Sequence, residues 1–266
     1  MATELVKAAP NSPIEARGVG RAILTDLPVS APDLVIALAV TAFAASVQSS
    51  AGIGFAIVSV PLLSLVDDRL APVPQILVVM PMVLWMAWRE RHAIDLSGVG
   101  WIMVGRFIGA GIGLFLLKWA SDTTLDVLVG LAVLAGVVIV GTGAKIRRTP
   151  ATQAAAGTAA SVTSMVASMG GPPLALLYHD ADGATIRSSL ATVFMFGVSL
   201  TIVLRAVSGE ISRTDVEVAV WLLPALLVGM AVGTRLSHLL EGPRIRLTIL
   251  TLSASASVGL LARAIF

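Results

Sequence analysis

The sequence has no cysteine among its 266 residues. Disulfide bonds, thiolate metal sites, c-type haem attachment and dithiol redox chemistry are therefore excluded. Charged residues are also scarce. They make up 13% of the chain, whereas a soluble domain carries about 25%. Hydrophobic residues reach 56%, and the mean hydropathy is +0.92. This composition indicates an all-α polytopic integral membrane protein.

Acidic side chains and catalytic motifs are missing from the predicted membrane interior. No Asp or Glu lies at the centre of any predicted span, although a proton-coupled carrier usually has a titratable group on its pathway. The motifs His-Glu-x-x-His and Gly-x-Ser-x-Gly do not occur, so a membrane-embedded enzyme is disfavoured. We expect no cofactor and no metal. The formal net charge is only +2, and the basic residues lie mostly in loops, so nucleic-acid binding has no support.

The chain divides into a tail and two halves. Residues 1–32 are polar and lack the apolar core of a cleavable signal peptide. The halves are interpreted as two homologous membrane repeats, covering 33–148 and 149–266. Apolar runs predict spans at 71–88, 98–117, 125–143, 184–206, 216–236 and 245–265.

The first half opens with a long apolar segment, 33–66, that contains no Lys, Arg or Glu. As one helix it would be about 51 Å long, which exceeds the bilayer core of about 30 Å. Its centre, Gln48-Ser49-Ser50-Ala51-Gly52-Ile53-Gly54, is a poor helix former. We therefore expect two half-helices that meet at an unwound turn. Such a turn can present backbone N–H groups and hydroxyls to a substrate, or it can be a small-residue patch for helix packing.

A second segment of the same form opens the other half. It runs from Ala154 through the break Met169-Gly170-Gly171-Pro172-Pro173 into another apolar stretch. Later, the Gly109/Gly113 pair aligns with Gly229/Gly233 at an offset of 120 residues, and such pairs let helices approach closely. Corresponding Gly- and Pro-broken segments in two halves are typical of a transporter with its site at the repeat interface.

These motifs resemble the TauE/SafE sulfite exporter family. The first signature is Gln48–Phe55 followed by Val60-Pro61-Leu62, and the second is Ser168–Pro173. Arg106, with the glycines that follow it, resembles the central Arg-Gly helix of the family. The resemblance covers about residues 33–266. It implies transport of sulfite or a small organosulfonate.

Arg106 supports anion binding independently, because it is the one basic residue deep in a predicted span. A buried guanidinium should face a cavity or a partner, and its fork matches a sulfite or sulfonate group. It can also be a structural residue that pairs with backbone carbonyls. Helix N-termini after Gly52 and Gly171 would add N–H donors. The predicted substrate-binding residues are Gln48, Ser49, Ser50, Gly52, Gly54, Arg106, Ser164, Ser168, Gly170, Gly171 and Pro172.

The topology depends on whether the broken segments cross the membrane. The basic loops 89–91 and 145–148 share one side, which their charge predicts to be cytoplasmic. If segment 33–66 is a re-entrant hairpin, each half has three crossings, the repeats are inverted and both termini lie outside. If it spans, each half has four crossings and the repeats are parallel. We favour the hairpin and inverted repeats.

The sequence thus predicts a transporter of a small sulfur-containing anion in the inner (cytoplasmic) membrane of a bacterium. Export needs no proton relay, because an inside-negative potential drives an anion outward by about 2.3 kcal/mol per charge per 100 mV. An anion channel or an uptake permease of the same fold are the alternatives. The expected partners are the anion and membrane lipid, and small residues on exposed spans make a homodimer plausible.

Overall fold

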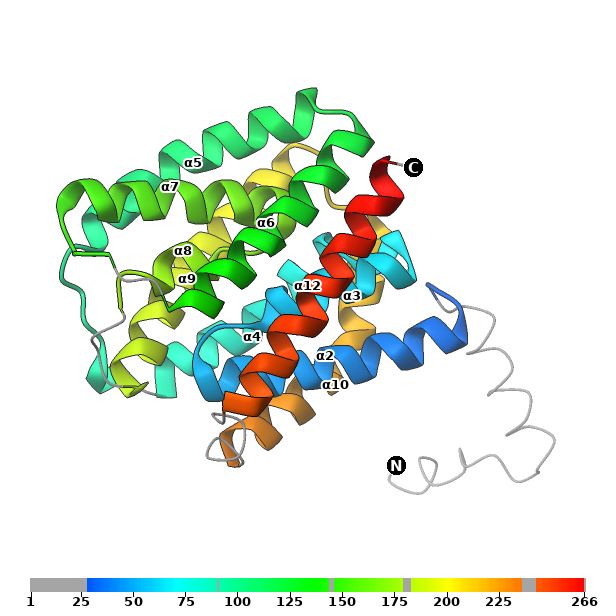
Figure 1. Cartoon of the computed structure of the whole chain (residues 1–266), viewed down its shortest axis with the longest axis horizontal. Coiled ribbons are helices and arrows are strands. Elements are labelled where there is room, and N and C mark those ends of the chain that lie inside the picture. The colour runs from blue at the N-terminus through cyan, green and yellow to red at the C-terminus, as the bar shows by residue number, and fades with distance from the viewer. Residues whose placement is uncertain (1–27, 90, 144–145, 179–182, 236–242, 266) are drawn as a thin grey trace, which may run out of the picture.

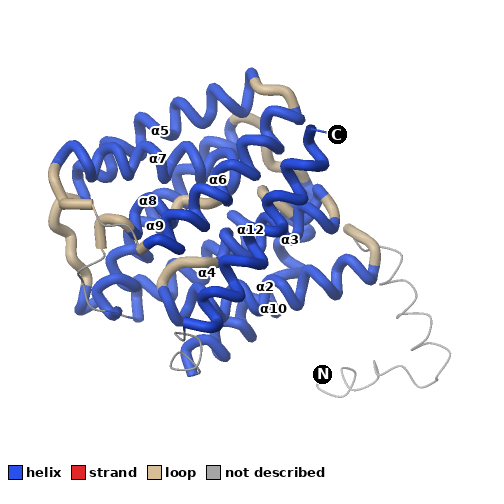
Figure 2. Tube along the Cα trace, in the orientation of Figure 1, coloured by secondary structure: helices blue, strands red, loops and turns tan. Residues whose placement is uncertain are grey.

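The computed structural model describes residues 28–89, 91–143, 146–178, 183–235 and 243–265. Throughout these residues every regular element is a helix (Figures 1 and 2). The predicted tail falls outside the described residues except for positions 28–32. The described helices are α2 (Ala31–Ala51), α3 (Phe55–Val66), η1 (Asp68–Leu70), α4 (Val73–Arg89), η2 (Arg91–Ala93), α5 (Val99–Trp119), α6 (Asp122–Thr142), α7 (Pro150–Ala167), α8 (Gly171–Ala175), α9 (Gly183–Val207), α10 (Arg213–Arg235) and α12 (Pro243–Ile265).

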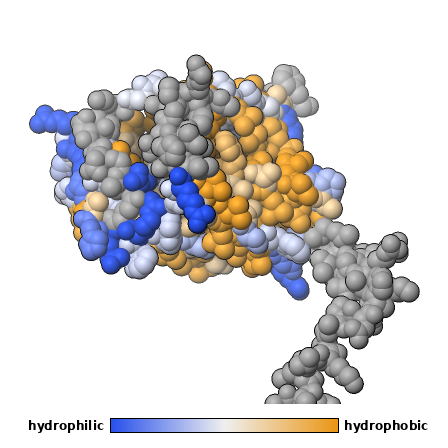
Figure 3. Space-filling view, turned by 90° about the horizontal axis from the view of Figure 1, so that it is seen from below, coloured by the Kyte–Doolittle hydropathy of each residue, from blue (hydrophilic) through white to orange (hydrophobic). Residues whose placement is uncertain are grey.

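Six of the helices are long and apolar enough to cross a bilayer, which confirms the membrane class. They are α2, the segment Asp68–Arg89 that contains α4, and helices α5, α6, α9 and α10. Five of them lie within a few residues of predicted spans, whereas α2 falls in the segment 33–66 that was predicted to be broken. The sixth predicted span, 245–265, corresponds to α12, whose apolar part in the described residues is the shorter stretch Ile249–Ala264. Hydrophobic side chains gather in a band between hydrophilic ends (Figure 3). Exposed Phe107 and Phe115 on α5 belong to the surface that such a protein presents to lipid.

Helices α2 and α3 form a hairpin around the first predicted break. Helix α2 ends at Ala51, and Gly52 (φ +83°) and Gly54 (φ +127°) turn the chain through backbone conformations that favour glycine. Just after α3, Arg69 Nη1 donates to the carbonyl of Pro28, just before α2, at 3.1 Å. The segment therefore returns to the side on which it started.

The arms of this hairpin are unequal, which differs from the two half-helices expected. Helix α2 has 21 residues, so it is about 31 Å long and reaches across most of a bilayer core. Helix α3 has only 12 residues, and the residues after it, as far as Arg69, complete the return to the starting side. Its outer end is tied to the last helix, because Arg263 of α12 donates to the Ser64 carbonyl at 3.2 Å.

Helices α7 and α8 make the corresponding hairpin in the second half. Helix α7 ends at Ala167, and the next residue, Ser168, adopts φ +54° and takes the place that Gly52 has in the first half. Helix α8 is a short return of five residues. The amide of Ile146, before α7, donates to the carbonyl of Leu176, after α8, at 3.3 Å. Within the described residues, each half therefore contains one hairpin followed by three long helices.

The halves pack through glycine contacts between helices. A Cβ added at Gly109 of α5 would lie 2.2 Å from the carbonyl oxygen of Thr158 on α7. Likewise, a Cβ at Gly229 of α10 would lie 2.2 Å from the carbonyl oxygen of Ala42 on α2. The expected close approach at both glycine pairs is confirmed, because only hydrogen fits between these backbones. A common origin of the two halves stays a prediction.

Corresponding helices of the two halves run in opposite directions. Helix α10 lies parallel to α2, because Gly229 meets Ala42 and Gly233 meets Ser46. The segment Asp68–Arg89 starts beside Pro28, on the side where α2 starts, and is long enough to cross to the other side. Helix α5 begins there together with α7, since Asp95 before α5 pairs with Arg148 before α7. The side of Asp95 carries most of the described basic residues of the loops and helix ends: Arg89, Arg91, Arg147, Arg148, Arg187 and Arg235. The side where α2 starts is richer in carboxylates.

Candidate anion-binding site

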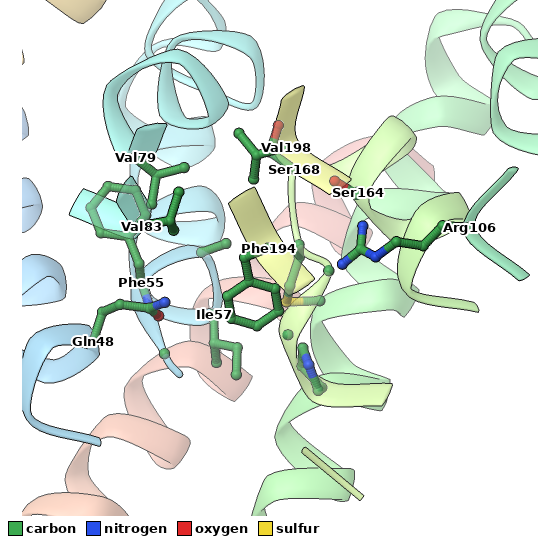
Figure 4. Close-up of a pocket in the computed structure, with 16 residues that line it drawn as sticks. Gln48, Phe55, Ile57, Val79, Val83, Arg106, Ser164, Ser168, Phe194 and Val198 are labelled. Atoms are coloured by element: carbon green, nitrogen blue, oxygen red, sulfur yellow. The ribbon is translucent and has the colours of Figure 1, made fainter. Parts of the chain in front are cut away.

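A cavity of about 50 Å³ lies where the two hairpin turns meet, between α4, α5 and α9 (Figure 4). By the same measure a water molecule needs roughly 10–15 Å³, so the space suits a ligand of a few non-hydrogen atoms. Its walls are mostly apolar, with a few polar groups and one cation. The lining residues are Gln48, Gly54, Phe55, Ala56, Ile57, Val79, Val83, Arg106, Ser164, Ser168, Met169, Gly170, Gly171, Pro172, Phe194 and Val198.

Gln48 organises the first turn. Its side-chain oxygen accepts a 2.9 Å hydrogen bond from the amide of Phe55, the first residue of α3. This bond satisfies one of the amides that have no partner within the helix at its N-terminus. The side-chain NH₂ of Gln48 has no partner in the part of the chain that the structure describes, and Gln48 lines the cavity. The group is therefore a donor available to a ligand, beside the start of α3.

Two serines contribute from the second turn. Ser164 is 2% exposed, and its hydroxyl lies 3.1 Å from that of Thr201 on α9. The Ser168 hydroxyl donates to the Pro72 carbonyl at 2.7 Å, which ties the turn to the start of α4. Both serines line the cavity, but neither hydroxyl proton is free. Ser168 donates to Pro72, and Ser164 donates to Thr201, because the Thr201 hydroxyl itself donates to the Gly197 carbonyl at 2.9 Å.

Helix α8 differs from the expectation of a second amide-rich helix N-terminus. It has five residues, and its first turn contains Pro172 and Pro173. Proline has no backbone N–H to donate. The second turn therefore lacks a run of backbone amides, whereas the first turn offers the N-terminus of a 12-residue helix.

Arg106 supplies the cation. It lies on α5 and is 2% exposed, and its guanidinium points into the cavity (Figure 4). Its Nε has no hydrogen-bond partner, and no carboxylate pairs with it among the described residues. The guanidinium rests on α9 at Gly197, where an added Cβ would lie 1.5 Å from Nη1. A buried, uncompensated cation of this kind favours an anionic ligand.

Three predicted residues lie outside the cavity lining. The Ser49 hydroxyl donates to the Ala45 carbonyl at 2.7 Å, and the Ser50 hydroxyl donates to the Val47 carbonyl at 2.9 Å. Helix α2 continues to Ala51, so both side chains bond back into their own helix instead of joining an unwound turn. Gly52 faces Arg187, with an added Cβ 3.0 Å from its Cγ.

Sequence reasoning missed the apolar walls and Gly197. Val79 and Val83 of α4, and Phe194 and Val198 of α9, line the cavity. Both pairs have the i, i+4 spacing of neighbours on one helix face, which is the signal that could have found them. Gly197 has no such signal, because its importance comes from a side chain on another helix.

Residues 37–260 match the family described as Sulfite exporter TauE/SafE, which covers both hairpins and all the long helices in whole or in part. No curated protein and no solved structure matches the chain significantly.

Proposed function

The chain belongs to the TauE/SafE sulfite exporter family, a transporter family, and from this premise we propose that it exports sulfite or a small organosulfonate from a bacterial cytoplasm. The cavity at the two hairpin turns is the proposed binding site. The predicted residues that line it are Gln48, Gly54, Arg106, Ser164, Ser168, Gly170, Gly171 and Pro172.

The observation that carries this proposal is the isolation of Arg106. A charge deep in a membrane protein is costly unless it is compensated, and within the described chain Arg106 has neither an ion pair nor a partner for its Nε. A sulfite or sulfonate group would supply the missing negative charge. Its oxygens can accept two parallel hydrogen bonds from one guanidinium.

The remaining donors fit the same ligand. The side-chain NH₂ of Gln48 lies at the cavity with Arg106 and can donate to an oxygen that the arginine does not contact. The Ser164 hydroxyl lies there too, but its proton is donated to Thr201, whose own proton goes to the Gly197 carbonyl. The cavity volume of about 50 Å³ favours a compact anion. Apolar neighbours such as Phe194 lower the local dielectric, which strengthens each of these bonds.

The distribution of charge predicts how the protein is oriented in the membrane, and the membrane potential favours outward transport of an anion. The basic side, which includes Arg147 and Arg148, is the cytoplasmic side by the positive-inside rule. The start of α2 and the end of α12 then both face outward. An inside-negative potential drives a monovalent anion outward by about 2.3 kcal/mol per 100 mV.

The test combines binding with transport for the purified full chain. Anaerobic sulfite, sulfoacetate, taurine, thiosulfate and sulfate are each tested for thermal stabilisation, because a ligand of the native state raises apparent stability. Proteoliposomes then measure counterflow of any anion that binds. We expect saturable, trans-stimulated flux of sulfite or an organosulfonate. No stabilisation by any sulfur anion would overturn the proposal, and flux without trans-stimulation but with single-channel currents would identify a channel instead.

A further inference from the structure

One face of α9 carries polar groups from the cavity towards the α9–α10 turn. Phe194, Val198, Thr201 and Arg205 follow one another at intervals of four, three and four residues, which places them on a single helical face. The first two line the cavity. Thr201 and Arg205 lie beyond it and are both buried.

Arg205 is a second buried arginine that the proposed binding site does not use. It is 2% exposed, and its Nε has no hydrogen-bond partner. Its Nη2 donates to the Met165 carbonyl in the last turn of α7. Glu210 and Asp215 are the carboxylates that act on it electrostatically, but neither forms an ion pair with it in the described structure. Sequence reasoning passed over Arg205 because it stands at the end of a predicted span.

Thr201 connects this arginine to the cavity. Its hydroxyl lies 3.1 Å from the Ser164 hydroxyl, and Ser164 lines the cavity. Thr201 also precedes Arg205 by one helical turn on the same face. From Gly197, on which Arg106 rests, to Arg205 is eight residues, or about 12 Å along the α9 axis. The Thr201 hydroxyl accepts from Ser164 and donates to the Gly197 carbonyl at 2.9 Å, so two hydrogen-bonded hydroxyl groups bridge the interval between two buried guanidinium groups.

We propose that Arg205 forms a second anion-binding position, on the translocation path between the central cavity and the α9–α10 turn. This inference rests on the proposed function and adds an exit step to it. An anion released by Arg106 would pass Ser164 and Thr201 and bind Arg205 before it leaves. Conduction favours several sites of moderate affinity over one tight site, since each occupant must be able to depart.

A structural role makes different predictions. Arg205 could serve only to cap α7, because a cation near a helix C-terminus stabilises its last carbonyls. Its removal would then lower the melting temperature, and a thiol at the buried Thr201 position would stay out of reach of an anionic reagent, because no path would lead to it. The test must therefore read the electrostatic environment of Thr201 directly.

The absence of cysteine makes this measurement clean. In Thr201→Cys, the single thiol is reacted with two methanethiosulfonate reagents of similar size, one bearing a sulfonate and one a quaternary ammonium. We expect the anionic reagent to react about tenfold faster than the cationic one, because a guanidinium lies one turn away. Adding Arg205→Gln should remove most of this preference. Val203→Cys is the matched control: Val203 is 57% exposed on the same turn of α9 and should show no dependence on Arg205.

Two outcomes would overturn the inference. One is a Thr201→Cys thiol that reacts with neither reagent, and the other is a charge preference unchanged by Arg205→Gln. Sulfite counterflow provides the functional arm: Arg205→Gln should slow it at least tenfold while thermal stabilisation by sulfite at Arg106 persists. Equal losses of binding and transport would also contradict a separate exit position. If sulfite fails to bind the unmodified protein, the proposed function fails, whereas the reagent preference still reports on Arg205.

Discussion

The guanidinium of Arg106 lies against the backbone of α9 at Gly197. A Cβ at that position would be 1.5 Å from Nη1 and 2.1 Å from Cζ, so the arginine can occupy this place only because residue 197 has no side chain. Gly197 is therefore a positioning residue for the one cation that lines the cavity.

Gly197→Ala tests this relationship. We expect the guanidinium to be displaced and sulfite affinity to fall by about tenfold or more, the value of one charged hydrogen bond. Alanine otherwise favours a helix over glycine, so the folded protein should still be recovered. Gly111→Ala on α5 is the control, because no atom lies within 4 Å of an added Cβ there. Isothermal titration of both variants measures the effect, and equal affinities would show that Arg106 does not depend on Gly197.

Substitution of Arg106 should separate function from stability. Arg106→Lys keeps the charge but loses the bidentate fork, so anion affinity should fall strongly. Arg106→Met should abolish binding, yet the ligand-free protein should melt at the same temperature or higher, because an unpaired buried charge is replaced by an apolar side chain. Melting curves with and without sulfite measure both effects. Normal transport by both variants would mean that Arg106 is structural.

The glycines of the two turns should respond differently to valine. Gly52 has φ +83° and packs on Arg187, so Gly52→Val should destabilise the protein by at least about 1–2 kcal/mol. Any folded fraction should bind the anion normally, because Gly52 does not line the cavity. Gly171 lines it, with an added Cβ at an ordinary 3.6 Å from Phe194. Gly171→Val should therefore fold and lose binding. Thermal melts and titrations of the two variants would contradict this if both changed in the same way.

The serines offer a finer comparison. Ser164→Ala removes a hydroxyl of the cavity wall that can donate to the anion only by giving up its bond to Thr201, so it should weaken anion binding by at most about 1 kcal/mol. Ser50→Ala should leave affinity unchanged, because the Ser50 hydroxyl bonds to Val47 within its own helix. Titration of each purified variant provides the measurement. A loss of affinity in Ser50→Ala would place the binding site nearer α2 than the cavity is.

Acid should weaken the contact between the two halves at Asp95. Hydrogen bonds from Ser97 and from Arg148 lower the pKa of this loop carboxyl to about 2, below the usual value of about 3.9. A carboxyl group whose pKa is lower in the folded than in the unfolded protein stabilises the fold at any pH above its unfolded pKa. This contribution is lost as the pH falls from about 4 to about 2. We expect Asp95→Asn to melt lower than the unmodified protein near neutral pH and to lose less on acidification. If the melting temperatures of the two proteins fell by equal amounts over this pH range, Asp95 would not be the group that titrates.

Much of the fold could be predicted because it depends on local properties of the chain. Apolar runs such as the one at α5 have a length set by the bilayer, so the spans were predicted within a few residues. Gly52 and Gly54 marked a break because their backbone freedom is a property of glycine itself. The glycine contacts of Gly109 and Gly229 followed from spacing along a helix. Arg106 could be recognised because an isolated arginine in an apolar run costs free energy to bury.

What the sequence could not determine is set by contacts between distant segments. Ser50 and Ser164 are equally small and polar, but only the packing of α2 and α7 decides which hydroxyl reaches the cavity. The return of the first hairpin required the meeting of Arg69 with Pro28, 41 positions apart. The position of the Arg106 guanidinium depends on Gly197. The proposed role of Arg205 depends on its proximity to Thr201 and, through it, to Ser164. By itself the sequence determined the membrane class, the helices and their breaks, because hydropathy and backbone freedom belong to single residues. The tertiary structure decided which groups face one anion, because that depends on three-dimensional proximity between helices.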